Sequence, residues 1–176
     1  AVVQGEVEIN RGIVVNDRME TSVPDIYAVG DAVQVKHFVT GQDALLSLAG
    51  PANKQGRIAA DNICGIPTTY KNTQGSAVLK IFDMTVATTG VNERAAKAAG
   101  LDYDKVYTFS NSHASYYPGS QSNTICLILD KATGRLLGAQ AIGSESVAGR
   151  INVFATAITC GMTSVPSADL TERLMC

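Results

Sequence analysis

The sequence has no tryptophan, no cluster of basic residues and no long apolar segment. Its 176 residues carry 14 Lys and Arg against 16 Asp and Glu, a net charge of −2, so we expect no nucleic-acid partner. No apolar run approaches the roughly 18 to 20 residues that a membrane-spanning helix needs, so we expect no membrane partner either. The chain shows no signal peptide and no initiating Met, and we expect it to be a fragment of a longer protein.

Cysteine is also scarce, and its four copies form no recognisable site. No two of them lie in a CxxC pair, and no Cys or His cluster has the spacing of a zinc site, so we expect no metal. Cys64, Cys126 and Cys160 lie in apolar segments, where a thiol behaves as a small hydrophobic group. We therefore expect reduced core cysteines in a cytoplasmic protein, and we assign no role to Cys176, the last residue.

The first third of the chain combines two predicted strands with one predicted helix. "GIVVN" (12–16) and "DIYAVGD" (25–31) are short apolar runs bounded by turn residues, which predicts strands. A helix is predicted from Pro51, with small or apolar residues at helical spacing, and it ends at Gly65. The polar segment 66–76 is the candidate domain boundary.

Beyond this boundary the pattern alternates between strand and helix signals. The predicted elements are a strand at 77–90 with a break near Asp83, a helix at 92–100 capped by Asn92, a strand at 105–112, a hairpin at 123–143, a helix at 146–161 and a last short helix from 165. This order predicts an α+β domain, an antiparallel sheet with helices on one side. We place one domain at 1–70 and a second at 77–176.

The apolar run 25–31 ends on a carboxylate, which raises the question of what the carboxylate binds. In open α/β sheets, ligands lie beyond the carboxyl ends of the strands, where Asp31 could accept a hydrogen bond from a ligand hydroxyl. Gly30 lets the backbone approach closely, and Ala32 leaves the approach open. On these residues alone, a simple surface Gly-Asp turn is the more common explanation.

The longer stretch "TSVPDIYAVGDA" (21–32) resembles the second flavin-binding motif of the FAD-dependent pyridine nucleotide–disulfide oxidoreductases. The resemblance implies that Asp31 binds the ribityl chain of FAD, with Thr21, Gly30 and Ala32 beside it. It also implies that residues 1–70 are the end of an α/β FAD-binding domain.

The next segment, "LAGPANKQGRIAADNI" (48–63), is similar to the segment that follows this motif in the family. The resemblance implies that the helix beginning near Pro51 and Ala52 lies beneath the isoalloxazine ring. A helix N-terminus favours the negative charge of a reduced flavin, so the physical chemistry agrees with this placement.

The second domain is similar to the C-terminal dimerisation domain of the same family, which implies a homodimer. "SHASYYPGS" (112–120) and "PANKQGR" (51–57) resemble the coenzyme A-disulfide reductase branch, which also holds NADH oxidases and polysulfide or persulfide reductases. This branch implies a parent enzyme that uses NAD(P)H to reduce coenzyme A disulfide or a polysulfide. The implied substrate contacts are Asn53, Arg57 and Tyr116, with Lys54 as a further candidate for coenzyme A phosphates.

The tyrosine pair admits two interpretations. Tyr116 and Tyr117 precede Pro-Gly, so we expect one ring to pack and the other to point outward. Equally, both rings could pack against a partner subunit.

Three family features are absent: the GxGxxG turn for the FAD pyrophosphate, the fold for the nicotinamide cofactor, and the single redox-active cysteine near the front. We therefore expect a C-terminal part whose redox cysteine lies outside this chain and which is inactive alone. Some family members use a His-Pro pair as an acid–base group, but His113 is followed by Ala. We expect His113, like His37, to be an exposed loop residue.

The predicted helix at 146–161 is apolar around much of its circumference. We expect the sheet to cover one side of it and a partner subunit the other, and we expect Arg150 to form an inter-subunit or surface salt bridge. Three alternatives remain open: a non-catalytic dimerisation module, an NADH oxidase parent, and an α+β binding domain unrelated to flavin.

Overall fold

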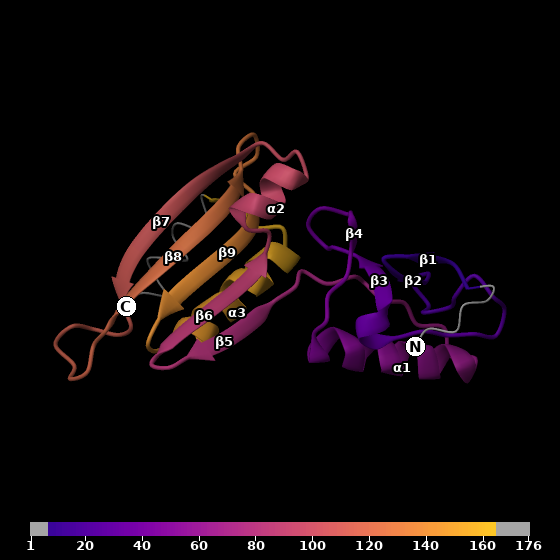
Figure 1. The fold of residues 1–176 in the computed structure, drawn as a ribbon. Coiled ribbons are helices and arrows are strands. Elements are labelled where there is room, and N and C mark those ends of the chain that lie inside the picture. The colour runs from indigo at the N-terminus through magenta and orange to yellow at the C-terminus, as the bar shows by residue number, and fades with distance from the viewer. Residues whose placement is uncertain (1–6, 165–176) are drawn as a thin grey trace. The chain divides into compact units, whose positions relative to one another are not determined.

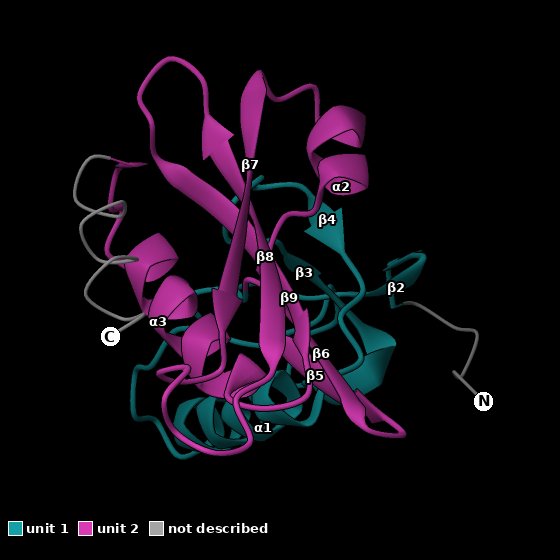
Figure 2. Cartoon of the chain, turned by 90° about the vertical axis from the view of Figure 1, so that its left-hand side faces the viewer, with its two compact units in different colours: residues 1–73 teal, residues 74–176 magenta. Residues whose placement is uncertain are grey.

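The chain divides into two compact units, which are coloured separately in Figure 2: unit 1 is residues 1–73 and unit 2 is residues 74–176. The structure is a computed structural model, and it describes residues 7–164. The short helix predicted from 165 and Cys176 lie outside the described residues.

Unit 1 contains a small mixed sheet and one long helix. Its elements are β1 (Ile9–Asn10), β2 (Gly12–Val14), a 3₁₀ turn η1 (Gly30–Ala32), β3 (Val33–Lys36), β4 (Asp43–Ala44) and α1 (Ala49–Ile63). The strand order is β1-β2-β3-β4, and only the β2–β3 pair, with Ile13 opposite Val33, is parallel. The buried core is Met19, Val33, Val35, Ala59 and Tyr70.

The strand predicted at 25–31 is wrong. Tyr27 forms a single bridge with Glu20, and the segment ends in η1 rather than in a strand. Ile26 and Val29 are 45% and 39% exposed. An interior parallel strand needs a hydrogen-bonded neighbour on each side, and within residues 7–164 only the Glu20 bridge pairs with this run.

Helix α1 confirms the predicted start and end. It begins at Ala49, two residues before Pro51, and it ends at Ile63. Its predicted apolar stripe is only partly correct, because Ile63 is 63% exposed and the buried positions include Gln55 and Asn62. These buried polar side chains must make hydrogen bonds to offset their lost hydration.

Unit 2 is a five-stranded antiparallel sheet with helices, and the antiparallel sheet was predicted from the sequence (Figure 1). The helices do not share one side of the sheet, contrary to the prediction: Glu93–Ala98 borders the face that carries Tyr107 and Gln140, and Val147–Thr159 covers the opposite face. The elements are β5 (Ala77–Ile81), β6 (Met84–Gly90), α2 (Glu93–Ala98), β7 (Tyr103–Asn111), β8 (Ser122–Asp130), β9 (Leu136–Gly143) and α3 (Val147–Thr159). The strand order is β5-β6-β9-β8-β7. The Asn92 cap is confirmed, because its side chain accepts a 2.8 Å hydrogen bond from the Ala95 amide.

The segment 77–90 is not one long strand. It forms the hairpin of β5 and β6, in which Ile81 pairs with Met84 across a turn at Phe82 and Asp83. The break predicted near Asp83 is therefore correct in position, but it reverses the direction of the chain.

One face of the unit 2 sheet is covered and the other is open. Ile125, Ala141 and Ala87 form a buried cross-strand row on the face that packs against α3. The next row, on the opposite face, runs across all five strands through Leu79, Val86, Ile142, Thr124 and Phe109. In that row Leu79, Ile142 and Phe109 are 60%, 43% and 74% exposed.

The outer side of α3 is less apolar than the sequence predicted, and its cover by a partner subunit stays a prediction. Its buried residues are Val147, Ile151, Phe154, Ala157 and Ile158. Ala148, Gly149, Asn152 and Thr156 are exposed on its outer side. Among the described residues, the large exposed apolar side chains of unit 2 therefore lie on the sheet rather than on α3.

We expect Gly138→Ala to destabilise unit 2, because β9 passes too close to the segment after β6 for a side chain at this position. A methyl carbon at Gly138 would lie 1.8 Å from the Val91 carbonyl oxygen. The expected loss in the free energy of unfolding is about 1–3 kcal/mol, measured by urea unfolding. Gly149→Ala on the exposed side of α3 is the control and should stabilise by up to ~1 kcal/mol. Equal stability of the Gly138→Ala variant and the wild type would contradict the close packing.

Candidate functional site

The candidate cofactor site of unit 1 is formed by η1 and the first turns of α1. The Gly30 backbone takes a φ of 81°, and its amide donates a 2.7 Å hydrogen bond to the Gln55 side-chain oxygen. A methyl carbon at Gly30 would lie 4.0 Å from the Ala52 side chain. These contacts hold the η1 backbone against α1, while the Asp31 and Ala32 side chains are exposed.

The N-terminus of α1 has no side-chain cap. Leu48 precedes the helix in an extended conformation, its side chain makes no capping hydrogen bond, and the first turn contains no acidic residue. The amide hydrogens of a first helical turn point outward and favour negative charge or hydrogen-bond acceptors. A carboxylate acceptor at Asp31 and amide donors at the start of α1 therefore belong to the same small region.

Thr21 lies in the turn that precedes η1, and its place beside a cofactor stays a prediction. Its hydroxyl donates a 3.2 Å hydrogen bond to the Val23 carbonyl, and its amide donates a 2.9 Å bond to the Ile26 carbonyl. These bonds stabilise the turn before η1, so the contacts of Thr21 are made with this turn.

Three polar residues near the start of α1 are free to meet a ligand. Asn53, Lys54 and Arg57 are exposed, and no side-chain hydrogen bond or ion pair is found for them among residues 7–164. Asn53 and Arg57 are four residues apart, so they lie on one face of the helix. Exposed polar side chains on a helix usually contact only solvent. A bound ligand would give these three residues a further role.

In unit 2, the loop between β7 and β8 carries the tyrosine pair and extends beyond the end of the sheet (Figure 1). Tyr116 and Tyr117 are 86% and 67% exposed, so the expectation that one of the rings packs into the protein is wrong. The two rings are in an edge contact with centroids 6.4 Å apart. Tyr117 also makes an edge contact with the His113 ring at 6.1 Å.

Neither histidine is simply exposed, contrary to expectation. His113 is half-buried, with Nδ1 3.1 Å from the Ser112 hydroxyl and Nε2 3.3 Å from the Pro118 carbonyl. His37 is also half-buried, and its Nδ1 accepts a 3.2 Å hydrogen bond from the Val39 amide. Both rings stabilise their own loops.

Arg150 does not form the predicted salt bridge with any of the described residues. Its guanidinium instead donates to the Ser110 hydroxyl at 2.6 Å and to the carbonyls of Asn111 and Ser112 at 2.5 and 3.3 Å. Partial burial lowers the pKa of Arg150 from its usual value. An arginine remains charged over the physiological range even so.

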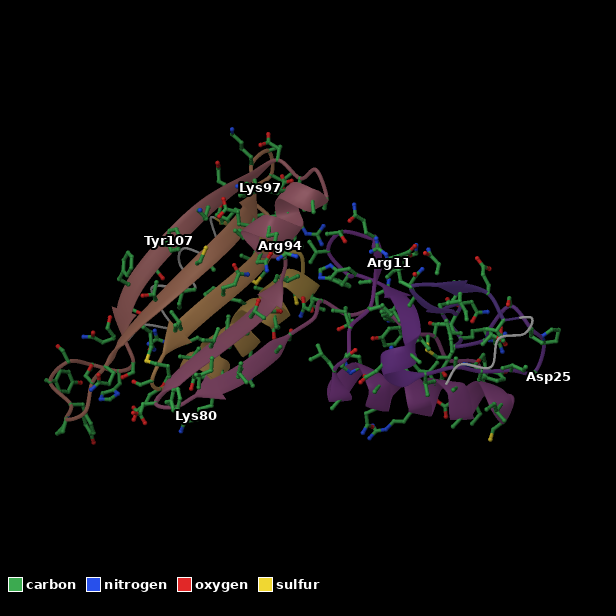
Figure 3. All side chains as sticks on the ribbon, viewed as in Figure 1. Arg11, Asp25, Lys80, Arg94, Lys97 and Tyr107 are labelled. Carbon is green, nitrogen blue, oxygen red and sulfur yellow. The ribbon has the colours of Figure 1, made fainter. Side chains whose placement is uncertain are left out.

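A groove of about 640 Å³ lies between α2 and the open sheet face of unit 2. No local sequence pattern indicates this groove, because its residues come from separate elements. The lining residues are Asn92, Glu93, Arg94, Lys97, Lys105, Tyr107, Cys126 and Gln140, and Figure 3 labels Arg94, Lys97 and Tyr107.

The groove carries Arg94, Lys97 and Lys105 against the single carboxylate of Glu93, and its thiol is kept neutral by burial. Hydrogen bonds from Lys105 at 2.8 Å, Lys97 and Tyr103 lower the pKa of Glu93 to about 2. Burial raises the pKa of Cys126, so its thiol stays protonated at neutral pH and is a poor nucleophile.

The other two described cysteines correct the prediction of core thiols. Cys64 and Cys160 are exposed, and they are the C-terminal caps of α1 and α3. Each directly follows the last residue of its helix, and the apolar residues next to it in the sequence, such as Ile63 and Ile158, led to the wrong prediction. Within residues 7–164, no group of three or more Cys, His, Asp or Glu residues is arranged to hold a metal ion, and no helix has the length and apolarity to cross a bilayer.

Comparison with known proteins identifies the family. Residues 76–171 match the dimerisation domain of the pyridine nucleotide-disulphide oxidoreductases, and residues 1–56 match the pyridine nucleotide-disulphide oxidoreductase domain. The chain belongs to this family. It falls in the branch that contains coenzyme A-disulfide reductases, NADH oxidases and polysulfide reductases. The α+β class and the order of the two parts, predicted from the sequence, are confirmed.

Individual relatives agree with this branch. The chain is 36% identical to the CoA-dependent NAD(P)H sulfur oxidoreductase of Pyrococcus furiosus, over 85% of this chain and 34% of that protein. It is 35% identical to the coenzyme A disulfide reductase of Staphylococcus aureus, over 91% of this chain and 36% of that protein. The structure of reduced Bacillus anthracis CoADR-RHD aligns with a TM-score of 0.86 and 45% identity, covering 89% of this chain and 29% of that one. The chain thus spans about a third of the length of its curated relatives.

We expect Gln55→Leu to destabilise unit 1 and to release η1 from α1. Gln55 is 2% exposed, so its removal leaves the Gly30 amide without its acceptor. The expected loss in the free energy of unfolding is about 1–3 kcal/mol by urea unfolding. Lys54→Leu, on the same turn but exposed, should change it by less than about 0.5 kcal/mol. Similar losses for the two variants would refute the assigned role of Gln55.

Proposed function

We propose that this chain supplies part of the FAD site and the dimer interface of an NAD(P)H-dependent disulfide reductase that acts on coenzyme A disulfide, a persulfide or a polysulfide. The observation that carries the proposal is the position of Gly30–Ala32 against the uncapped start of α1. The family is FAD- and NAD(P)H-dependent, and the chain belongs to it. The acceptor and the cytoplasmic location remain proposals.

The residues at η1 and α1 fit the polar groups of a flavin. Asp31 would accept a hydrogen bond from a ribityl hydroxyl, with Thr21, Gly30 and Ala32 beside it. Pro51 and Ala52 would lie at the ring, where the first-turn amides of α1 favour negative charge.

FAD would carry two electrons from NAD(P)H to the disulfide, while the redox cysteine lies outside this chain. Coenzyme A disulfide would gain the two electrons and two protons and would leave as two thiols. This chain would contribute binding and orientation rather than the nucleophile.

Each unit carries its own candidate substrate contacts. Arg57, supported by Asn53 and Lys54, would pair with the phosphates of coenzyme A, because the guanidinium fork matches phosphate oxygens. The exposed hydroxyl of Tyr116 would donate a hydrogen bond to the sulfur that becomes a thiolate when the S–S bond breaks.

A second copy of this chain would cover the open face of the unit 2 sheet. The matched domain is a dimerisation domain, and the row from Leu79 to Phe109 places large apolar side chains on one continuous surface. Exposed apolar patches of this kind mark interfaces.

Two alternatives keep specific support. The match to a dimerisation domain over residues 76–171 suits a chain that only dimerises. The branch also contains NADH oxidases, in which dioxygen replaces the disulfide as acceptor.

The flavin proposal is tested in the flavoenzyme that contains this chain. We expect Asp31→Ala to lower the FAD content of the purified enzyme at least tenfold, because the ribityl chain loses a charged hydrogen-bond acceptor. Asp43→Ala is the control, since the ion pair of this exposed carboxylate within residues 7–164 is with exposed Lys36. Full FAD content in the Asp31→Ala enzyme would refute the assignment.

The acceptor is then identified by NAD(P)H oxidation with coenzyme A disulfide, polysulfide or dioxygen. Faster oxidation with the disulfide or polysulfide supports the proposal. Rapid oxidation with dioxygen alone would establish the oxidase alternative.

Dimerisation is tested with the chain itself by light scattering after gel filtration. We expect a dimer for the wild type and a monomer for Leu79→Glu or Phe109→Glu at micromolar concentration, because a charge on an apolar interface is costly to bury. Thr156→Glu on the exposed side of α3 should remain dimeric. A wild-type monomer, or dimers of all variants, would refute this interface.

A further inference from the structure

The loop between β7 and β8 has a closed neck. The Ser112 amide donates a 2.7 Å hydrogen bond to the Gln121 carbonyl. In return, the Gln121 amide donates a 3.1 Å bond to the Ser112 hydroxyl. These two bonds join the ends of the segment, which we call the tyrosine loop (residues 112–121).

The interior of the tyrosine loop is also tied together. The Tyr117 amide donates a 3.0 Å bond to the Ala114 carbonyl, and the Ser120 hydroxyl donates a 3.1 Å bond to the His113 carbonyl. A segment with this many local bonds has few alternative conformations to lose when a ligand binds.

His113 connects the neck of the loop to its tip. The Pro118 carbonyl can only accept, so the 3.3 Å contact places a proton on Nε2 of the ring. In the neutral ring Nδ1 then accepts from the Ser112 hydroxyl, which itself accepts from the Gln121 amide. All three polar groups of this chain of bonds are satisfied at once.

Arg150 connects the neck to the helix layer. It lies on α3, about 40 residues further along the chain, and its guanidinium contacts three successive residues of the strand end and neck. Two of its bonds go to backbone carbonyls, so the contact fixes the path of the main chain rather than one side chain.

The result is an ordered loop that nonetheless exposes two aromatic rings. Tyr116 is 86% exposed, and within residues 7–164 the ring contact found for it is the edge contact with Tyr117. Ordering a loop costs conformational entropy, and exposed rings return none of it through burial. Such an arrangement suits a binding residue that is held in place before its ligand arrives.

We propose that Arg150 and His113 are positioning residues, which fix the tyrosine loop so that the Tyr116 hydroxyl is presented to the thiol or disulfide of the substrate. The role of Tyr116 rests on the proposed function, whereas the fixing of the loop does not. The two parts are therefore tested separately.

The fixing of the loop is tested in the 176-residue chain labelled with 3-fluorotyrosine, by ¹⁹F NMR. The signals of Tyr116 and Tyr117 are assigned with single Tyr→Phe variants. In Arg150→Ala and in His113→Ala we expect both signals to move toward the value of free 3-fluorotyrosine, because the loop loses a bond that holds its neck or tip.

The remaining signals and matched variants separate a local change from unfolding. Tyr103, at the other end of β7, should keep its wild-type signal in every variant. Arg94→Ala removes an exposed arginine of the same unit and should leave the loop signals unchanged. His113→Gln, whose amide can replace the Nε2 donor, should restore part of the wild-type spectrum. Wild-type loop signals in both alanine variants would overturn the proposal.

Whether the ordered loop serves to position Tyr116 is tested by a double-mutant cycle in the flavoenzyme, with coenzyme A disulfide as substrate. We expect Arg150→Ala to lower kcat/KM by between about tenfold and a hundredfold, as misplacement of a contact group does. In the Tyr116→Phe background the same change should cost less than about twofold, because Arg150 then has no hydroxyl to position. An unchanged kcat/KM in the Tyr116→Phe enzyme would refute the substrate role of Tyr116 and therefore the proposed purpose of the loop. Equal losses from Arg150→Ala in the two backgrounds would refute the proposal that Arg150 acts through Tyr116.

Discussion

The hydrogen bond from the Gly30 amide to Gln55 is the contact on which the candidate flavin site depends. It joins a short turn, which carries Asp31, to the helix whose N-terminal amides would meet the ring. The acceptor is buried at 2% exposure, so water cannot easily replace it. Unit 1 therefore places a carboxylate and a helix N-terminus together through one side chain from the second turn of α1.

Unit 2 uses α3 for two purposes. Its apolar side closes the core against the rows that include Ile125 and Ala141, and its Arg150 reaches the strand end from which the tyrosine loop begins. The same helix that stabilises the sheet thus sets the geometry of the loop. A ligand contact supported in this way does not depend on the mobility typical of long loops.

Local signals were sufficient for much of the fold, and non-local contacts account for what the sequence did not reveal. The Asn92 cap, the start of α1 near Pro51 and the hairpin at 123–143 each depend on neighbouring residues. The strand at 25–31 was wrong because a strand is defined by its partners. The partners of Arg150 lie 38 to 40 residues away, and no periodicity in the sequence indicates them.

Strand β5 exposes an apolar edge that could make the separated chain prone to aggregation. In the part of the chain that the structure describes, it pairs with β6 alone, so its outer edge presents unpaired backbone groups, and Val78, Leu79 and Ile81 are 59%, 60% and 47% exposed. Exposed apolar edges of this kind template strand addition and fibrils, and in this strand Lys80 is the one charged residue that opposes it. Subunit pairing through the open face would then cover the exposed Leu79 side chain, and a mutation that separates the copies would make the chain more prone to aggregate before it unfolds.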